Sequence, residues 1–115
     1  MPTMMTADPK DAPAPLPAVF RALAHAERLH IMSLFVAANA HDPGACLSIT
    51  QVAELAEVSR FCASRHLAIL REAGFLTAQR DGNFALHALS PVAPDQIDEW
   101  ISPLLETTER LHARL

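Results

Sequence analysis

The sequence is poor in aromatic residues, glycine and lysine. Its 115 residues include five Phe, one Trp, no Tyr, three Gly and a single lysine, Lys10. No run of about 18 apolar residues is present, so we expect no membrane span, and nothing at the N-terminus is typical of a signal peptide. Two cysteines, Cys46 and Cys62, are too few for a disulfide framework, and a reducing cytoplasm is the expected compartment.

The remaining composition is that of an ordinary globular protein, with 50% apolar and 19% charged residues. The formal net charge of −4 by itself argues against a nucleic-acid binder. The charge is unevenly distributed, however, because residues 59–87 carry four arginines against two acidic residues. Positive charge is therefore concentrated in the middle of the chain, where a nucleic-acid contact would need it.

The chain divides into a short leader and one domain. Residues 1–15 contain four prolines and no apolar period, which predicts a disordered leader. Residues 16–115 are enough for a single domain with its own core.

Helical spacing dominates the first half of this domain. Leu16, Val19, Phe20 and Leu23 predict a first helix, and a second is expected over 27–38. The second should bury a broad face made by Leu29, Met32, Leu34, Phe35 and Val36. A loop with Pro and Gly is expected over 39–44. The capping box of Ser48 and Gln51 then predicts a helix over 49–56 that buries Val52, Leu55 and Ala56.

The next helix has a clear start, a clear stop and two faces of different character. Ser59 is a natural N-cap and Gly74 a natural stop, so the helix between them is short. One side is small or apolar, comprising Ala63, Leu67, Leu70 and Gly74. The other carries Arg60, Phe61, Ser64, Arg65 and Ala68, a surface that fits a DNA major groove. Two short helices joined by a tight turn indicate a helix-turn-helix, although the turn lacks the usual glycine.

After Gly74 the apolar period changes to two. Strands over 75–80 and 84–89 flank Asp81-Gly82, a strong hairpin dipeptide. The helix between Ser59 and Gly74 would be the recognition helix, the one that enters the DNA groove. A hairpin that follows it directly in the chain is a wing, and the tip of this wing would place Arg80 and Asn83 near the phosphate backbone.

Pro91 and Pro94 permit a last helix with an apolar stripe of Ile97, Ile101, Leu104, Thr108 and Leu111, which Pro103 should kink or interrupt. The predicted fold class is mainly α with a small β-hairpin. It is a winged helix-turn-helix in the order α-α-α-α-β-β-α. We expect a homodimer through the terminal helices, whose stripes a small domain cannot fully cover. The alternative is that the stripes cover the core of a monomer.

Two motifs resemble those of the ArsR/SmtB-type repressors. Residues 20–31 read F-R-A-L-A-H-A-E-R-L-H-I and resemble the opening signature of that family. Ser64-Arg65-His66-Leu67 and the following Leu70-Arg71-Glu72-Ala73-Gly74 are similar to its recognition helix, and Arg80-Asp81-Gly82 falls at its wing turn. The resemblance covers about residues 17–112. It implies a homodimeric repressor that leaves its operator when an inducer binds or a thiol changes state.

The metal sites of that family are not matched. Ile49 to Ala56 contain no cysteine, whereas the family's thiolate site needs a Cys-x-Cys-type pair there. The entry to the last helix, Ser90 to Ala93, offers no ligand for the family's zinc site, which leaves Glu109 and His112 as a weak pair. We therefore assign no metal ligands and no cofactor. A metal or small-molecule inducer stays open.

Candidate switch residues are Cys46, just before the capping box, and Cys62, in the first turn of the recognition helix. A helix N-terminus favours a thiolate, so oxidation or metallation at Cys62 would alter the DNA-reading helix directly. The plainer interpretation is that Cys62 is a small packing residue. His66 is expected to be a packed, hydrogen-bonded histidine and not a metal ligand.

The sequence thus predicts a transcriptional repressor that binds double-stranded operator DNA as a homodimer, with no membrane association. Its base-reading residues are Ser59, Arg60, Phe61, Ser64 and Arg65, and its phosphate contacts are Arg80 and Asn83. The alternative is a winged-helix protein-interaction module without sequence-specific DNA binding. No catalytic constellation is evident, so an enzyme is not expected.

Overall fold

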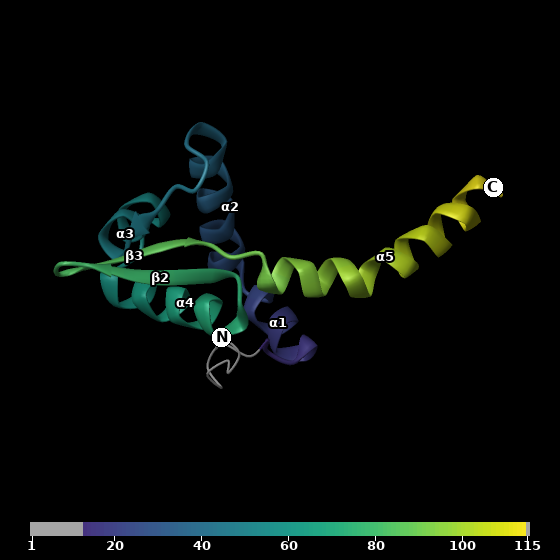
Figure 1. Ribbon diagram of the computed structural model, residues 1–115, viewed down its shortest axis with the longest axis horizontal. Coiled ribbons are helices and arrows are strands. Elements are labelled where there is room, and N and C mark those ends of the chain that lie inside the picture. Colours follow the sequence, from purple (N-terminus) through teal and green to yellow (C-terminus); the bar gives the residue numbers. More distant parts are fainter. Residues whose placement is uncertain (1–12, 115) are drawn as a thin grey trace, which may run out of the picture.

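The computed structural model describes residues 13–114, and Figure 1 shows how the elements are arranged. In chain order they are α1 (Leu16–Leu23), α2 (Ala26–His41), β1 (Leu47–Ser48), α3 (Ile49–Ala56), α4 (Arg60–Ala73), β2 (Leu76–Asp81), β3 (Phe84–Leu89) and α5 (Val92–Ala113). The predicted winged helix-turn-helix is confirmed. Most of the predicted leader, residues 1–12, lies outside the described residues. None of the described helices is long and apolar enough to cross a membrane.

Helix α2 is longer than the sequence predicts. It continues to His41, so the expected loop over 39–44 is partly helical. Asn39 explains the extension, because its side chain donates to the Phe35 carbonyl at 2.8 Å and accepts from the Gly44 backbone N–H at 2.9 Å. The N-cap of the helix is His25, whose Nδ1 accepts from the Glu27 backbone N–H at 3.2 Å. Both ends of α2 are therefore fixed by side chains that bond to the backbone.

Helices α3 and α4 form the helix-turn-helix. The predicted capping box is present, with Ser48 and Gln51 bonded reciprocally. Ser59 caps α4 through its hydroxyl, which accepts from the Cys62 backbone N–H at 3.0 Å. The turn between the helices needs a left-handed residue, and Glu57 supplies it with φ +57°. The turn lacks the usual glycine because Glu57 itself adopts the left-handed conformation that glycine usually adopts there.

The sheet has three strands in the order β1-β3-β2, all antiparallel, and β1 was not predicted. Two residues make β1, too few for a period to show, and it pairs Leu47 with His87. The wing turn is also displaced by one residue from the prediction. Asp81 still pairs with Phe84, so the two-residue connection is Gly82-Asn83, with φ +63° at Gly82. Glycine at the first turn position is typical of a type II′ turn.

The core lies between the helices and the inner face of the sheet. Its largest fully buried apolar side chains are Phe35, Ile31, Leu67, Leu70, Leu76, Val19 and Val52. The inner face of α4 is buried as predicted. The broad buried face predicted for α2 is wrong, because Leu29 and Val36 are exposed. The predicted burial of Leu55 is also wrong, because its side chain is 53% exposed. Burial in this small domain is limited to one narrow stripe on each helix.

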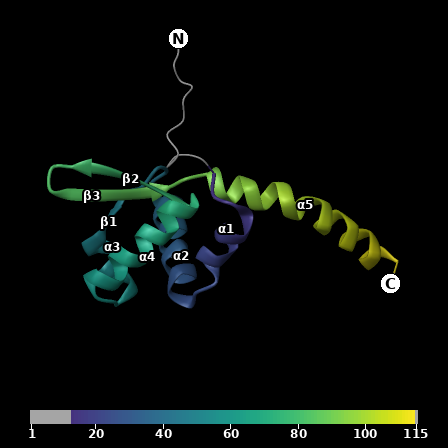
Figure 2. The same ribbon diagram turned by 90° about the horizontal axis from the view of Figure 1, so that it is seen from below.

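Helix α5 extends away from the rest of the domain (Figures 1 and 2). It continues through Pro103 without interruption, and its axis changes direction about halfway along (Figure 1). Proline lacks the N–H that would bond to the preceding turn, which accounts for a bend in place of a break. Ile97 and Ile101 are half-buried, whereas Leu104 and Leu111 in the distal half are exposed.

Candidate nucleic-acid interface

The N-terminal half of α4 presents an exposed polar and aromatic surface. Ser59, Arg60, Phe61, Ser64 and Arg65 are all exposed, as the helical spacing predicts. Phe61 is 71% exposed, and the Arg65 guanidinium carbon lies 6.0 Å from the centre of its ring. A cation at that distance from an aromatic face is weakly attracted to it, so Phe61 helps to orient Arg65. This surface combines donors for base edges with an apolar group that suits a thymine methyl.

The wing and the recognition helix meet in one small cleft. Arg60 of α4 lines it together with Arg80, Asn83, Phe84 and Ala85 of the hairpin, and its volume is about 160 Å³. The structure thus brings three of the seven sequence-predicted residues to a single place. Two guanidinium groups that line one cleft can donate charge-assisted hydrogen bonds to a phosphate group.

The same cleft is lined by three further residues that the sequence did not single out. Ser48, Ile49 and Thr50, at the N-terminus of α3, complete its lining. Ser48 was interpreted only as a helix cap. The available signal was the helix start itself, because unpaired backbone N–H groups and the helix dipole favour an anion at that end.

The comparisons with known proteins agree with this geometry. No family model matches the chain. The arsenic resistance transcriptional regulator ArsR1 of Pseudomonas putida is 34% identical over 98 residues, covering 76% of this chain and 72% of that protein. The chain belongs to the ArsR family of transcriptional regulators. The predicted resemblance of the chain to this family is therefore confirmed.

Solved structures support the fold of this ArsR-family protein. The crystal structure of an ArsR family transcriptional regulator matches with a TM-score of 0.67 at 16% identity, over 82% of this chain and 90% of that one. A homodimeric winged helix-turn-helix DNA-binding domain from Mycobacterium bovis matches with a TM-score of 0.57 at 18% identity, over 87% and 83%. At these identities the likeness establishes the architecture alone.

The two cysteines of this ArsR-family chain are both free and exposed. The Cys46 thiol lies 3.7 Å from the Gly44 carbonyl oxygen, in the segment before β1. Cys62 lies in the first turn of α4, beside the residues predicted to read bases. It is not the semi-buried packing residue of the plainer interpretation, and a reagent in solution can reach either thiol.

His66 lies on the other side of α4, and it is packed and hydrogen-bonded as predicted. It is 9% exposed, and its Nε2 lies 2.8 Å from Glu27 Oε1. Its Nδ1 lies 3.4 Å from Nη1 of Arg28, whose Nε donates to the Ala22 carbonyl at 2.6 Å. These contacts connect the recognition helix to the start of α2.

A second titratable group, His87, is buried in the sheet. Burial lowers the pKa of His87 below its ordinary value of 6.5, and the nearby Arg71 charge lowers it further, against a raising contribution from the Ala85 backbone. Its Nδ1 has no hydrogen-bond partner. A neutral imidazole is therefore the form that the fold favours.

The terminal helices of the ArsR-family chain share an exposed apolar surface. Phe20 of α1 and Trp100 of α5 pack edge to face, with ring centres 5.7 Å apart and planes at 74°. Trp100 nevertheless stays 51% exposed. Leu104, Leu105 and Leu111 are also exposed farther along α5. A groove of about 600 Å³ between α2 and α5 adjoins it, and Leu29, Met32, Val36, Ile97 and Ile101 help to line it.

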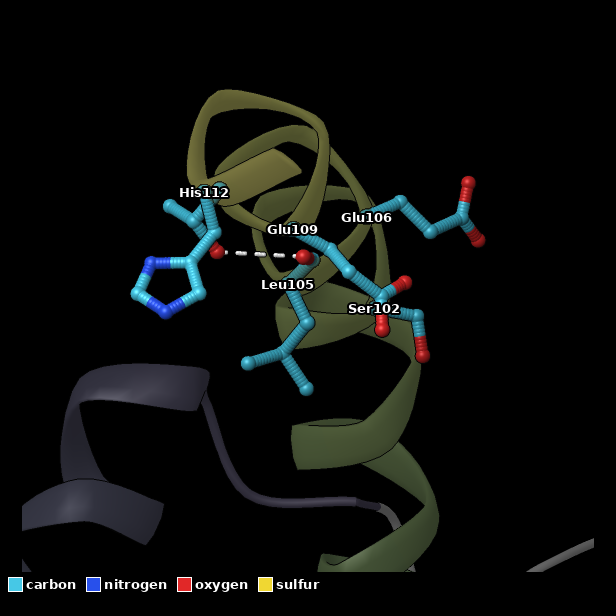
Figure 3. A pocket seen from close by; sticks show the side chains of 6 residues that line it. Ser102, Leu105, Glu106, Glu109 and His112 are labelled. Carbon is cyan, nitrogen blue, oxygen red and sulfur yellow. Dashed lines mark hydrogen bonds between the residues drawn. The ribbon is translucent and has the colours of Figure 1, made fainter. Parts of the chain in front are cut away.

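The weak metal pair considered from sequence, Glu109 and His112, lies in the distal half of α5. Figure 3 shows that the two side chains point in different directions around the helix. The dashed bond in that view joins the Thr108 hydroxyl to the Leu105 carbonyl at 3.0 Å and involves neither residue. Within one chain these two side chains do not converge on a common point.

Proposed function

We propose that the protein is a homodimeric repressor that binds operator DNA in the cytoplasm and has no enzymatic activity. The observation that supports DNA binding best is the cleft in which Arg60 of the recognition helix and Arg80 of the wing meet. In this proposal α4 enters the major groove, where Arg65 and Ser64 reach base edges. Arg80 and Asn83 contact the phosphate backbone, which fixes the register of the helix.

The negative net charge does not oppose this role, because the acidic residues lie elsewhere. Eleven of the 13 acidic residues lie outside residues 59–87, five of them in α5, and the arginines of residues 59–87 gather at the cleft and along α4. Phosphate contact depends on local charge, since the field of a distant carboxylate is screened within about 10 Å at moderate salt.

The proposed dimer forms through α1 and α5. The exposed apolar surface at Phe20, Trp100 and Leu104 supports it, because monomers seldom leave so much contiguous apolar surface in water. A two-fold axis there would present the two α4 helices to half-sites about one DNA turn apart. Leu104→Glu should yield a monomer in sedimentation experiments, whereas Arg110→Glu, on another side of α5, should stay dimeric. A monomeric wild-type protein would contradict the dimer.

We also propose that release from DNA depends on a signal, and the exposed Cys62 in the first turn of α4 supports a thiol signal. Cys46 is a second candidate. An oxidised or metallated Cys62 would stand among the groups proposed to read bases and would block their approach.

One binding titration tests the function. Reduced protein is added to a labelled fragment of its own promoter and to a scrambled fragment of equal length, at low salt, before and after mild oxidation. The proposal predicts tight binding to the promoter alone, with loss on oxidation and recovery with reductant. Arg65→Ala should weaken binding, and Arg110→Ala, which removes the same charge from α5, should not.

The outcomes separate the alternatives. Equal affinity for both fragments, or none, would overturn the repressor and favour the protein-interaction module. Binding that oxidation leaves unchanged would overturn the thiol signal and leave the DNA-binding role intact. If the DNA affinity of the Cys62→Ser variant stays sensitive to oxidation, the signal would be assigned to Cys46.

A further inference from the structure

Three potential metal ligands from two helices come together on the side of α4 that carries His66. They are His25, the N-cap of α2, Glu27 in its first turn, and His66 of α4, and their ligand atoms all lie within 4.8 Å of one another. Among the described residues this is the one group of three such side chains. The two imidazole rings are 4.8 Å apart between centres. We propose that these residues bind a divalent transition-metal ion, of which Zn²⁺ is the natural probe.

The donor set fits such an ion. Two imidazole nitrogens and one carboxylate oxygen are ligands that Zn²⁺ accepts, at bond lengths of about 2.0–2.2 Å. Ligands of a tetrahedral ion with these bonds are roughly 3.3 Å apart, so the group needs only a small contraction. His25 and Glu27 are exposed and free to make that adjustment, whereas His66 is buried and anchored. Three protein ligands leave the fourth position to water or another small ligand.

Binding would exchange hydrogen bonds for metal bonds. The contact between His66 Nε2 and Glu27 Oε1, 2.8 Å, is replaced by two bonds to the ion. The proton on Nε2 moves to Nδ1, which ends the long 3.4 Å contact with Arg28 Nη1. Arg28 keeps its bond to the Ala22 carbonyl. His25 likewise gives up the cap bond from the Glu27 backbone N–H, 3.2 Å, when its ring turns to the ion.

The Arg28 guanidinium sets a limit on the affinity. Its positive charge beside His66 disfavours a second cation, and the Glu27 carboxylate offsets that charge. We therefore expect a site that exchanges its metal readily, unlike a permanent structural zinc site.

The ion would connect two elements that only side-chain contacts connect in its absence. His66 follows Arg65 directly in α4, so a metal bond at His66 would hold the recognition helix to the N-terminus of α2. A change in operator affinity on metal binding is the expected consequence, which rests on the proposed function, whereas metal binding itself does not.

The test measures metal binding without DNA. Full-length protein, first treated with a chelator, is dialysed against Zn²⁺, and Co²⁺ is used in parallel because its absorption spectrum reports nitrogen and oxygen coordination. His25→Asn removes the imidazole but keeps a good N-cap, so the fold should be preserved. Glu27→Gln removes the carboxylate charge. His41→Asn, an exposed histidine at the other end of α2, is the matched control.

We expect one ion per wild-type chain and per His41→Asn chain, and binding weakened at least about tenfold in His25→Asn and Glu27→Gln. No binding to the wild type, or equal binding by His25→Asn, would overturn the proposal. Loss of binding in His112→Asn with full binding in His25→Asn would place the site on α5 and overturn it as well. Because no DNA is present, a failure here leaves the proposed function untouched.

Discussion

The imidazole of His66 in the recognition helix meets the carboxylate of Glu27 at the start of α2, with Nε2 and Oε1 2.8 Å apart. Thirty-nine positions separate the two residues in the chain. The same ring also contacts Arg28, which donates to the Ala22 carbonyl in the last turn of α1. Three helices are thereby joined through one buried side chain, on the side of α4 opposite the face predicted to contact DNA.

This contact should stabilise the fold. His66→Ala removes a buried ring and its two polar contacts, and we expect the free energy of unfolding to fall by about 1–3 kcal/mol. Urea unfolding with a chelator present measures it. His30→Ala, at an exposed position of α2, should stay within about 0.5 kcal/mol of wild type. Equal losses in the two variants would show that the contact contributes nothing.

Arg65 and Arg80 should differ in what they do for DNA binding. Arg65→Ala should lose about 1–3 kcal/mol of binding free energy and relax specificity at one base pair, if its guanidinium binds a guanine edge. Arg80→Ala should weaken binding on every sequence and reduce the salt slope by about one unit, because we propose that Arg80 contacts phosphate. Titrations at several salt concentrations, on matched and mutated operators, distinguish the two. A uniform loss for Arg65→Ala would make it a phosphate contact.

His87 should make the fold sensitive to acid. Its pKa is lowered in the folded protein, mainly by burial, so the unfolded chain binds the proton more readily. The free energy of unfolding should therefore fall as the pH drops through about 6.5, and this contribution should be complete once the pH is below the folded pKa. Unfolding curves about one pH unit on either side of 6.5 measure the loss.

His87→Leu is the control for that effect. The leucine fills a similar space without the unpaired Nδ1, and the other histidines are unchanged, so the difference between the two proteins reports His87 alone. The variant should lose less stability in acid than wild type. The same acid loss in both proteins would contradict the assignment.

Glu57 should be a point of strain in the helix-turn-helix. A non-glycine residue in the left-handed region costs about 1–2 kcal/mol, and glycine returns roughly half of that as extra chain entropy in the unfolded state. Glu57→Gly should therefore raise the free energy of unfolding by about 0.5–1 kcal/mol. Glu54→Gly, the same change inside α3, should instead lower it by about 1 kcal/mol. A decrease in both variants would argue against strain at Glu57.

Elements whose signals are local could be predicted from the sequence. Ser48, Ser59 and Gly74 mark helix ends through bonds to their own neighbours, so their caps could be predicted without knowing the fold. The apolar period changes from that of a helix to that of a strand after Gly74, and this change, which is also a local signal, predicted the wing. The exposed face of α4 followed from its spacing, and with it five of the seven candidate DNA contacts.

Features that depend on residues far apart in the chain could not be predicted, because they form only when the elements pack together. The two-residue strand β1 exists because β3 is there to pair with it, and Leu29, Val36 and Leu55 are exposed because one narrow core takes only part of each apolar face. The cleft of Arg60 and Arg80 and the group of His25, Glu27 and His66 likewise arise only when separate elements pack. No spacing along the sequence encodes a distance across the fold, since such distances are set by how the helices dock.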